Sequence, residues 1–273
     1  MSGSSMHGRG GGAIELAGIT ALAWLLLACI PWGLGGIGLS WDALNHHIYL
    51  GWVAEQPRFD RDFLAASYQS YQYPYLYWPA YKLFMAGVSG PVAGTVLVSL
   101  HVLAVPALWL IARVCVPGAD GYAMTMRLAA VLLGLSGELL LSLMDTTAND
   151  GLAAVPFVWA VALALWAASE PPSARWPIAA WVASSGLLAG IAVAFKLSNG
   201  PLALVLPLLW ATSGRGFVER ALNVARGGAA TIAGFVLAYG YWGAQLWTNF
   251  GNPLYPFYDG WFVGLRAAVG WQP

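Results

Sequence analysis

The chain has 273 residues, of which 59% are hydrophobic and only 9% are charged, and its formal net charge is zero. A soluble domain carries about 25% charged residues, so this composition excludes an ordinary water-exposed globular protein. A neutral chain without a polybasic block also excludes a nucleic-acid partner, whose phosphates need a basic surface. The mean hydropathy of +0.65 and the many Trp and Tyr residues are typical of an integral membrane protein with aromatic belts.

In chain order, the sequence predicts an all-α, polytopic transmembrane helix bundle with about seven spans. Residues 1–12, rich in Gly and Ser, predict a disordered tail. Apolar runs near bilayer length then predict spans at 13–38, 92–113, 128–144, 151–168, 177–195, 201–211 and 228–247. The sixth run is short and contains Pro201 and Pro207, which predicts a broken or tilted helix.

The longest polar stretch lies between the first two spans, in an outside loop over residues 39–91. We expect amphipathic interface helices there, the first running from Asp42 to about Glu55. Residues 73–90 are apolar, but they hold several Tyr and Pro residues and Lys82. This mixture favours an interface or re-entrant helix over a span. Residues 261–273 predict a further interface segment.

The distribution of charge predicts the orientation. With seven spans and the N-terminus inside, six arginines fall in inside loops, as the positive-inside rule requires: Arg113, Arg127, Arg175, Arg215, Arg220 and Arg226. The acids Asp42, Asp145, Asp150 and Asp259 then fall outside. Ten Arg against two Lys suggests a bacterial source. We therefore expect a bacterial inner (cytoplasmic) membrane, with the N-terminus cytoplasmic and the site facing the periplasm.

Polar residues from separate parts of the chain gather at this outer face, where a site is expected because polar groups at membrane depth are costly. Asp42 is either a helix cap or a carboxylate that accepts a proton from a hydroxyl, and His46 shares its helix face. Asp150 is either a solvated loop residue or a second acid of the site. Lys196 either snorkels or binds an anionic phosphate. No third ligand joins Asp42 and His46, so no metal site is predicted.

In this order, these segments resemble the conserved module of the GT-C superfamily, membrane glycosyltransferases that use polyprenyl-phosphate sugars. The resemblance covers about residues 14–260 and is to the aminoarabinose and mannosyl transferases of that group. After the acid at Asp42, it is carried by Tyr73-Pro74-Tyr75-Leu76-Tyr77-Trp78, Thr147-Ala148-Asn149-Asp150-Gly151, Gly186 to Gly190 through Lys196, and Gly251-Asn252-Pro253-Leu254-Tyr255-Pro256-Phe257. Residues 13–260 would form the family's N-terminal seven-span module. Pro74 stands alone where the family has two prolines, and the chain stops at Pro273 where family members usually continue.

The resemblance implies an inverting transfer of a sugar from a polyprenyl-phosphate donor to an acceptor at the outer face. Asp42 would be the catalytic base and Asp150 the second acid. Substrate contacts would come from His46, Tyr75, Lys196 and Asn252. The expected partners are the donor and membrane lipid; no organic cofactor is expected, and the need for a divalent cation stays open.

Two other functions compete with this one. The short chain and its many aromatics also suit a non-catalytic subunit or scaffold of a larger membrane protein complex. The Pro-interrupted sixth span suits a small transporter, but no inverted repeat is present in the sequence.

Overall fold

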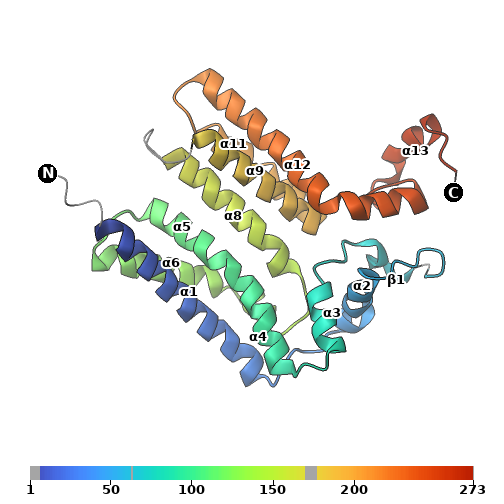
Figure 1. Cartoon of the computed structure of the whole chain (residues 1–273), viewed down its shortest axis with the longest axis horizontal. Coiled ribbons are helices and arrows are strands. Elements are labelled where there is room, and N and C mark those ends of the chain that lie inside the picture. Colours follow the sequence, from blue (N-terminus) through green and yellow to red (C-terminus); the bar gives the residue numbers. More distant parts are fainter. Residues whose placement is uncertain (1–6, 63, 170–176, 273) are drawn as a thin grey trace.

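The computed structural model describes residues 7–62, 64–169 and 177–272, which are predominantly helical (Figure 1). Within these ranges, five helical segments are long and apolar enough to cross a membrane. They are α1 (His7–Gly33), α4 (Gly90–His101) continuing into α5 (Val105–Cys115), α8 (Asp150–Ser169), α9 (Ile178–Phe195) and α12 (Phe217–Phe250). The predicted all-α membrane bundle is therefore confirmed.

The other two predicted spans correspond to interrupted, shorter helices. The segment predicted at 128–144 forms α6 (Gly121–Leu135) and α7 (Glu138–Ser142), separated by Ser136 and Gly137. Its first helix begins early because the Asp120 carboxylate accepts a hydrogen bond from the Ala123 amide at 2.9 Å. The segment predicted at 201–211 forms α10 (Gly200–Ala203) and α11 (Leu206–Trp210), each with a proline in its first turn, as its two prolines led us to expect.

Two boundaries differ from the prediction. α1 begins at His7, inside the stretch predicted as a tail, whose residues 1–6 lie outside the described ranges. α12 begins at Phe217, eleven residues before the predicted span, because the polar residues of its first turns are also helical. At 1.5 Å per residue its 34 residues extend about 51 Å, well beyond the ~30 Å hydrocarbon core.

The helices alternate in direction, so the connections lie at two ends (Figure 1). The start of α1, the α5–α6 connection and the start of α12 lie at one end. The outside loop lies at the other end, near the end of α12, with α2 (Ile48–Val53), β1 (Ala65–Tyr68), α3 (Trp78–Met85) and α13 (Asp259–Ala268). The structure thus brings the predicted outer-face segments to one end of the bundle.

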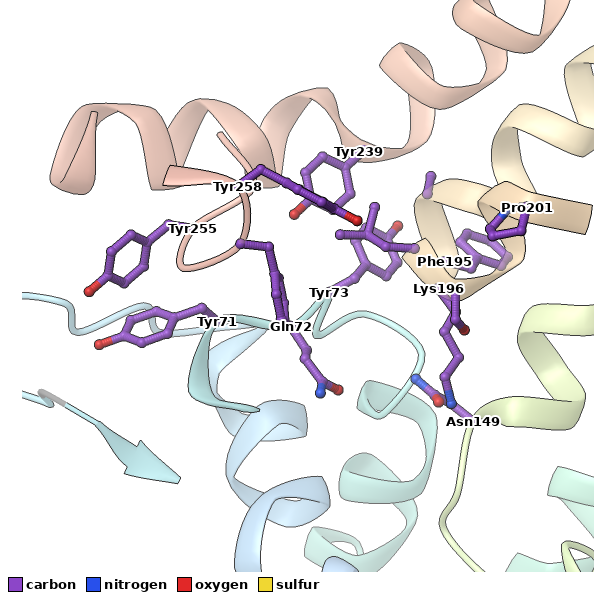
Figure 2. Close-up of a pocket in the computed structure, with 14 residues that line it drawn as sticks. Tyr71, Gln72, Tyr73, Asn149, Phe195, Lys196, Pro201, Tyr239, Tyr255 and Tyr258 are labelled. Atoms are coloured by element: carbon purple, nitrogen blue, oxygen red, sulfur yellow. The ribbon is translucent and has the colours of Figure 1, made fainter. Parts of the chain in front are cut away.

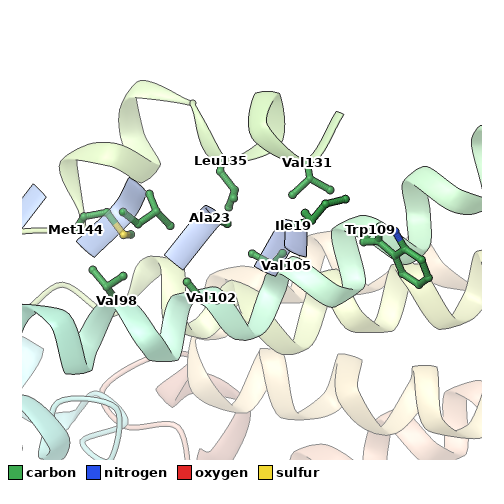
Figure 3. Close-up of a cluster of buried hydrophobic side chains, with 10 residues drawn as sticks. Ile19, Ala23, Val98, Val102, Val105, Trp109, Val131, Leu135 and Met144 are labelled. Atoms are coloured by element: carbon green, nitrogen blue, oxygen red, sulfur yellow. The ribbon is translucent and has the colours of Figure 1, made fainter. Parts of the chain in front are cut away.

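The first half of the bundle packs α1, α4, α5 and α6 around one apolar core (Figure 3). Its members include Ile19 and Ala23 of α1, Val98 and Val105 of the second span, and Val131 of α6. At the end away from the outside loop, this half also contains a buried ion pair. Arg127 of α6 donates to both carboxylate oxygens of Glu15 in α1, at 2.6 and 2.8 Å, so the helices are joined by charge as well as by packing.

The second half packs α8, α9, α11 and α12, with glycines at the crossing of α9 and α12. A Cβ at Gly186 would meet the Gly227 carbonyl, and one at Gly190 would meet the backbone of Thr231 and Phe235. A Cβ at Gly234 would meet the Leu187 backbone. The two helices therefore touch backbone to backbone, and this contact fixes the end of α9, where Lys196 lies.

The outside loop is folded onto the end of the bundle. A π-helical turn (Ala43–His47) leads into α2, and a 3₁₀ turn (Gln69–Tyr71) follows β1. α3 has eight residues, about 12 Å, which is too short to cross a membrane, as expected for residues 73–90. The indole nitrogen of Trp242 in α12 donates to the Tyr71 carbonyl at 3.1 Å, which ties the loop to the last long helix.

Candidate functional site

Asp42 lies at the start of the π-helical turn with its side chain 54% exposed. Sequence alone left capping as one explanation for this acid. Within the described chain, its side chain makes no capping hydrogen bond, and the Ser40 hydroxyl accepts the Ala43 amide instead, at 3.1 Å. The side-chain capping explanation is therefore wrong, and the carboxylate instead lies 3.7 Å from the buried Nδ1 atom of His46.

Behind Asp42 lies a buried group of three rings, His46, His47 and Tyr77. The two imidazoles meet edge to face at 4.3 Å, and His47 stacks on Tyr77 at 4.7 Å. The Nδ1 atom of His47 is 2.8 Å from the Thr147 hydroxyl. The contact between His47 and Thr147, which are 100 positions apart, joins the outside loop to the segment before α8.

Charged groups surround these rings. Burial lowers the pKa of His47 to about 4, the His46 ring adds to the fall, and the carboxylates of Asp42 and Asp150 oppose it. Burial raises the pKa of Tyr77, and the charges of Asp150 and Asp42 raise it further. Both carboxylates therefore lie close enough to act on the same buried rings. The structure brings these two predicted acids to one place.

Lys196 follows α9 directly and forms an ion pair with Asp150, the first residue of α8. The side chains are 35% and 50% exposed, so both are accessible. Asn199 holds the backbone on either side, because its amide donates to the carbonyls of Ala192 at 2.9 Å and Ala153 at 3.2 Å. The turn after α9 is therefore held in place by these hydrogen bonds, and it exposes the ammonium of Lys196.

A cavity of about 360 Å³ opens beside Lys196 (Figure 2). Its wall is mainly aromatic and comes from the outside loop, α9, α12 and the turn that follows α12. Figure 2 shows Lys196 extending from the end of α9 toward Asn149, while Tyr73, Tyr239 and Tyr258 gather on the other side. The cavity therefore has one charged corner and an aromatic interior.

The two remaining predicted contacts lie elsewhere. Tyr75 packs against Tyr73 at 5.2 Å and Trp242 at 6.4 Å, and Tyr73 lines the cavity. Asn252 is fully buried; its amide donates to the Phe257 carbonyl at 2.9 Å and its oxygen accepts the Leu254 amide at 2.8 Å. Asn252 therefore shapes the turn whose aromatic residues border the cavity.

Some residues of the site were missed from sequence. Tyr77 belongs to the aromatic stretch noted above, but no pattern distinguished it from its neighbours. Gln69 begins the same unusual stretch, and nothing in the sequence distinguished it from its neighbours, although its amide lies against His46 at 3.4 Å. Tyr239 sits in an apolar helix and shows no signal beyond its hydroxyl.

No group of three His, Cys, Asp or Glu side chains that could hold a metal ion occurs in the described part of the chain. The chain matches no protein-family model, no curated protein and no solved structure.

Proposed function

We propose that this chain is a membrane glycosyltransferase that moves a sugar from a polyprenyl phosphate to an acceptor hydroxyl at the outer face of a bacterial inner membrane. One observation carries the proposal. The Asp42 carboxylate lies 3.7 Å from the buried His46 ring, and Asp150 pairs with Lys196, which lines an aromatic cavity. The N-terminus would be cytoplasmic and the site would face the periplasm.

Asp42 is the proposed general base. Its carboxylate is half exposed and has no capping role among the described residues, so it is available to an incoming hydroxyl. The acceptor oxygen attacks the anomeric carbon and forms the new C–O bond as its proton passes to Asp42. The bond between that carbon and the phosphate oxygen breaks, and polyprenyl phosphate leaves with the electron pair. A positioned base contributes about 10²–10⁴-fold to such a step.

Lys196 is the proposed phosphate contact. A phosphate that enters the charged corner of the cavity would meet an ammonium whose present partner, Asp150, is half exposed. Positive charge at that point would stabilise the negative charge that develops on the leaving phosphate. Asp150 would then be released from its ion pair as the donor binds.

The cavity suits a ligand with an apolar or ring-shaped part next to a phosphate. Its volume of about 360 Å³ falls within the 300–1,000 Å³ usual for small-molecule sites. Tyr73, Phe195 and Tyr239 offer flat faces to a sugar ring or to isoprenoid methyl groups, and Ser198 and Asn149 offer polar contacts.

The test uses the full chain in lipid nanodiscs, with polyprenyl-phosphate mannose and polyprenyl-phosphate aminoarabinose as donors and a bacterial membrane extract as the acceptor source. Released polyprenyl phosphate is measured by mass spectrometry. We expect Asp42→Asn to lower the release rate at least about 100-fold. Asp60→Asn is the matched control, because Asp60 lies in the same loop, is 71% exposed and pairs only with its neighbour Arg61 among the described residues.

Thermal unfolding of both variants checks that the fold is intact. Unchanged release by a folded Asp42→Asn protein would refute the assignment of the base. Absence of release from both donors with the unmodified chain would refute the proposed function itself.

A further inference from the structure

A buried histidine stands behind the exposed carboxylate of Asp42. His46 lies one turn later and is only 4% exposed, and its Nδ1 atom is 3.7 Å from Asp42 Oδ1. In the described ranges, Nδ1 has no hydrogen-bond partner. A buried polar atom without a partner costs about 1–3 kcal/mol of stability. The position of His46 Nδ1 next to Asp42 is therefore more readily explained by a role than by packing.

The other ring nitrogen indicates where the proton is. His46 Nε2 lies 3.4 Å from the side-chain nitrogen of Gln69, and an amide nitrogen can only donate. Nε2 must therefore accept, so a neutral ring carries its proton on Nδ1, on the side of Asp42. The orientation of Gln69 is fixed in turn, because its side-chain oxygen accepts from the Asn45 amide at 3.0 Å.

These contacts form one directional chain from Asn45 through Gln69 and His46 to Asp42. The π-helical turn supplies Asn45 and His46, Asp42 directly precedes it, and the 3₁₀ turn after β1 supplies Gln69. An extra residue in a helical turn often occurs at functional sites, since it redirects consecutive side chains. Here Asn45 and His46 both reach Gln69 from adjacent positions.

We propose that Asn45 and Gln69 hold His46 as its Nδ1-protonated tautomer, and that His46 is thereby a positioning residue that aims the Asp42 carboxylate. The role rests on the proposed function, in which Asp42 accepts a proton. The distance of 3.7 Å is longer than a hydrogen bond, and contacts of this kind tighten when substrate binds. An N–H aimed at the carboxylate favours one of its rotamers.

Other titratable groups also face His46. The His47 ring is 4.3 Å away, the Tyr77 ring is 6.2 Å away, and the charge of Lys196 acts from the end of α9. His47 and Tyr77 are uncharged near neutral pH, and Lys196 is paired with Asp150. Asp42 is therefore the anion that the Nδ1 proton meets.

Two variants of His46 distinguish positioning from simple packing. In His46→Asn the amide nitrogen occupies roughly the place of Nδ1, whereas in His46→Gln it occupies roughly the place of Nε2. In the nanodisc assay we expect His46→Gln to lower kcat about 10- to 100-fold with little change in KM, as for loss of a hydrogen bond to a charged group. His46→Asn should recover most of the rate.

Equal losses of kcat in the two variants would overturn the positioning role. That result is what a purely structural histidine would give.

A second measurement does not depend on catalysis. Nitrogen-15 NMR of the histidine-labelled chain in nanodiscs reports the tautomer of each ring, with His46→Asn used for assignment. We expect an Nδ1-protonated His46, and a mixture of tautomers in Gln69→Leu. An Nε2-protonated ring in the unmodified chain would overturn this inference even if donor turnover is observed. The expected tautomer in a chain that turns over no donor would instead reject the glycosyltransferase proposal and, with it, the role given to His46.

Discussion

Replacing Gly190 with alanine tests whether the crossing of α9 and α12 is as close as the structure has it. The added Cβ would overlap the Thr231 carbonyl oxygen and lie 2.6 Å from the Phe235 nitrogen, whereas ordinary contacts begin at 3.4 Å. Both neighbours are backbone atoms, so no side chain can rotate away. The helices would have to separate by roughly 1 Å, and overpacking of this kind costs about 1–3 kcal/mol.

The same substitution at an uncrowded helical position should change the free energy of unfolding in the opposite direction. At Gly228 of α12, nothing lies within 4 Å of an added Cβ. Alanine is preferred over glycine in a helix by about 1 kcal/mol, so Gly228→Ala should be neutral or stabilising. Both glycines lie inside helices, so the gain in helix propensity is common to the two variants. They should therefore differ by the overpacking cost alone, about 1–3 kcal/mol in the free energy of unfolding.

The assay is reversible unfolding of the purified protein in mixed micelles, followed by tryptophan fluorescence. Gly190→Ala should unfold at lower denaturant than the unmodified chain, and Gly228→Ala at equal or higher denaturant. Equal midpoints for Gly190→Ala and the unmodified chain would refute the close crossing. Since the crossing fixes the end of α9, Gly190→Ala should also weaken the pairing of Lys196 with Asp150.

Two further predictions concern buried polar groups. Arg127→Met should lower the free energy of unfolding by about 3–5 kcal/mol because it leaves the Glu15 carboxylate buried without its partner, and adding Glu15→Leu should restore most of the loss; a single variant as stable as the unmodified chain would contradict this. Acidification should destabilise the outside loop through His47, whose pKa is lowered to about 4 by burial. The unfolded state binds the proton first, so stability is complete above about pH 6.5 and falls between about pH 6.5 and 4, by on the order of 2–3 kcal/mol. Unfolding midpoints measured across this range should flatten in His47→Asn, and an equally steep fall in that variant would exclude His47 as the cause.

The membrane helices could be predicted because lipid imposes a simple rule. A run of apolar residues near bilayer length identifies a span wherever the run is continuous, as in α8 and α9. The rule weakens where polar residues continue a helix or a short break divides it. It therefore missed the start of α12 and the interruption at Ser136 and Gly137.

The site could be predicted only in outline. The order of the predicted spans and the distribution of charge placed Asp42, Asp150 and Lys196 at one end of the bundle. This placement depends only on the topology of the spans. The contacts of individual residues depend on irregular backbone, which has no repeating pattern. Ser40 and Asp42 are both good capping residues, for example, and only the local backbone decides which one caps.

The aromatic stretch of the outside loop illustrates the same limit. Tyr73 and Tyr75 are two residues apart in the same stretch and chemically identical, yet one borders the cavity and the other packs against Trp242. Asn252 likewise belongs to a turn recognised by its Asn-Pro sequence, but its hydrogen bonds within that turn could not be read from the sequence.

The pair formed by Glu15 and Arg127 also has a consequence for biosynthesis. The two residues are 112 positions apart, so the ribosome makes Glu15 long before its partner. At about 5–20 residues per second, the carboxylate of the first helix waits about 6–22 seconds for its arginine. During that interval the Glu15 carboxylate has no Arg127 to pair with, so this link between α1 and α6 can form only after α6 has emerged.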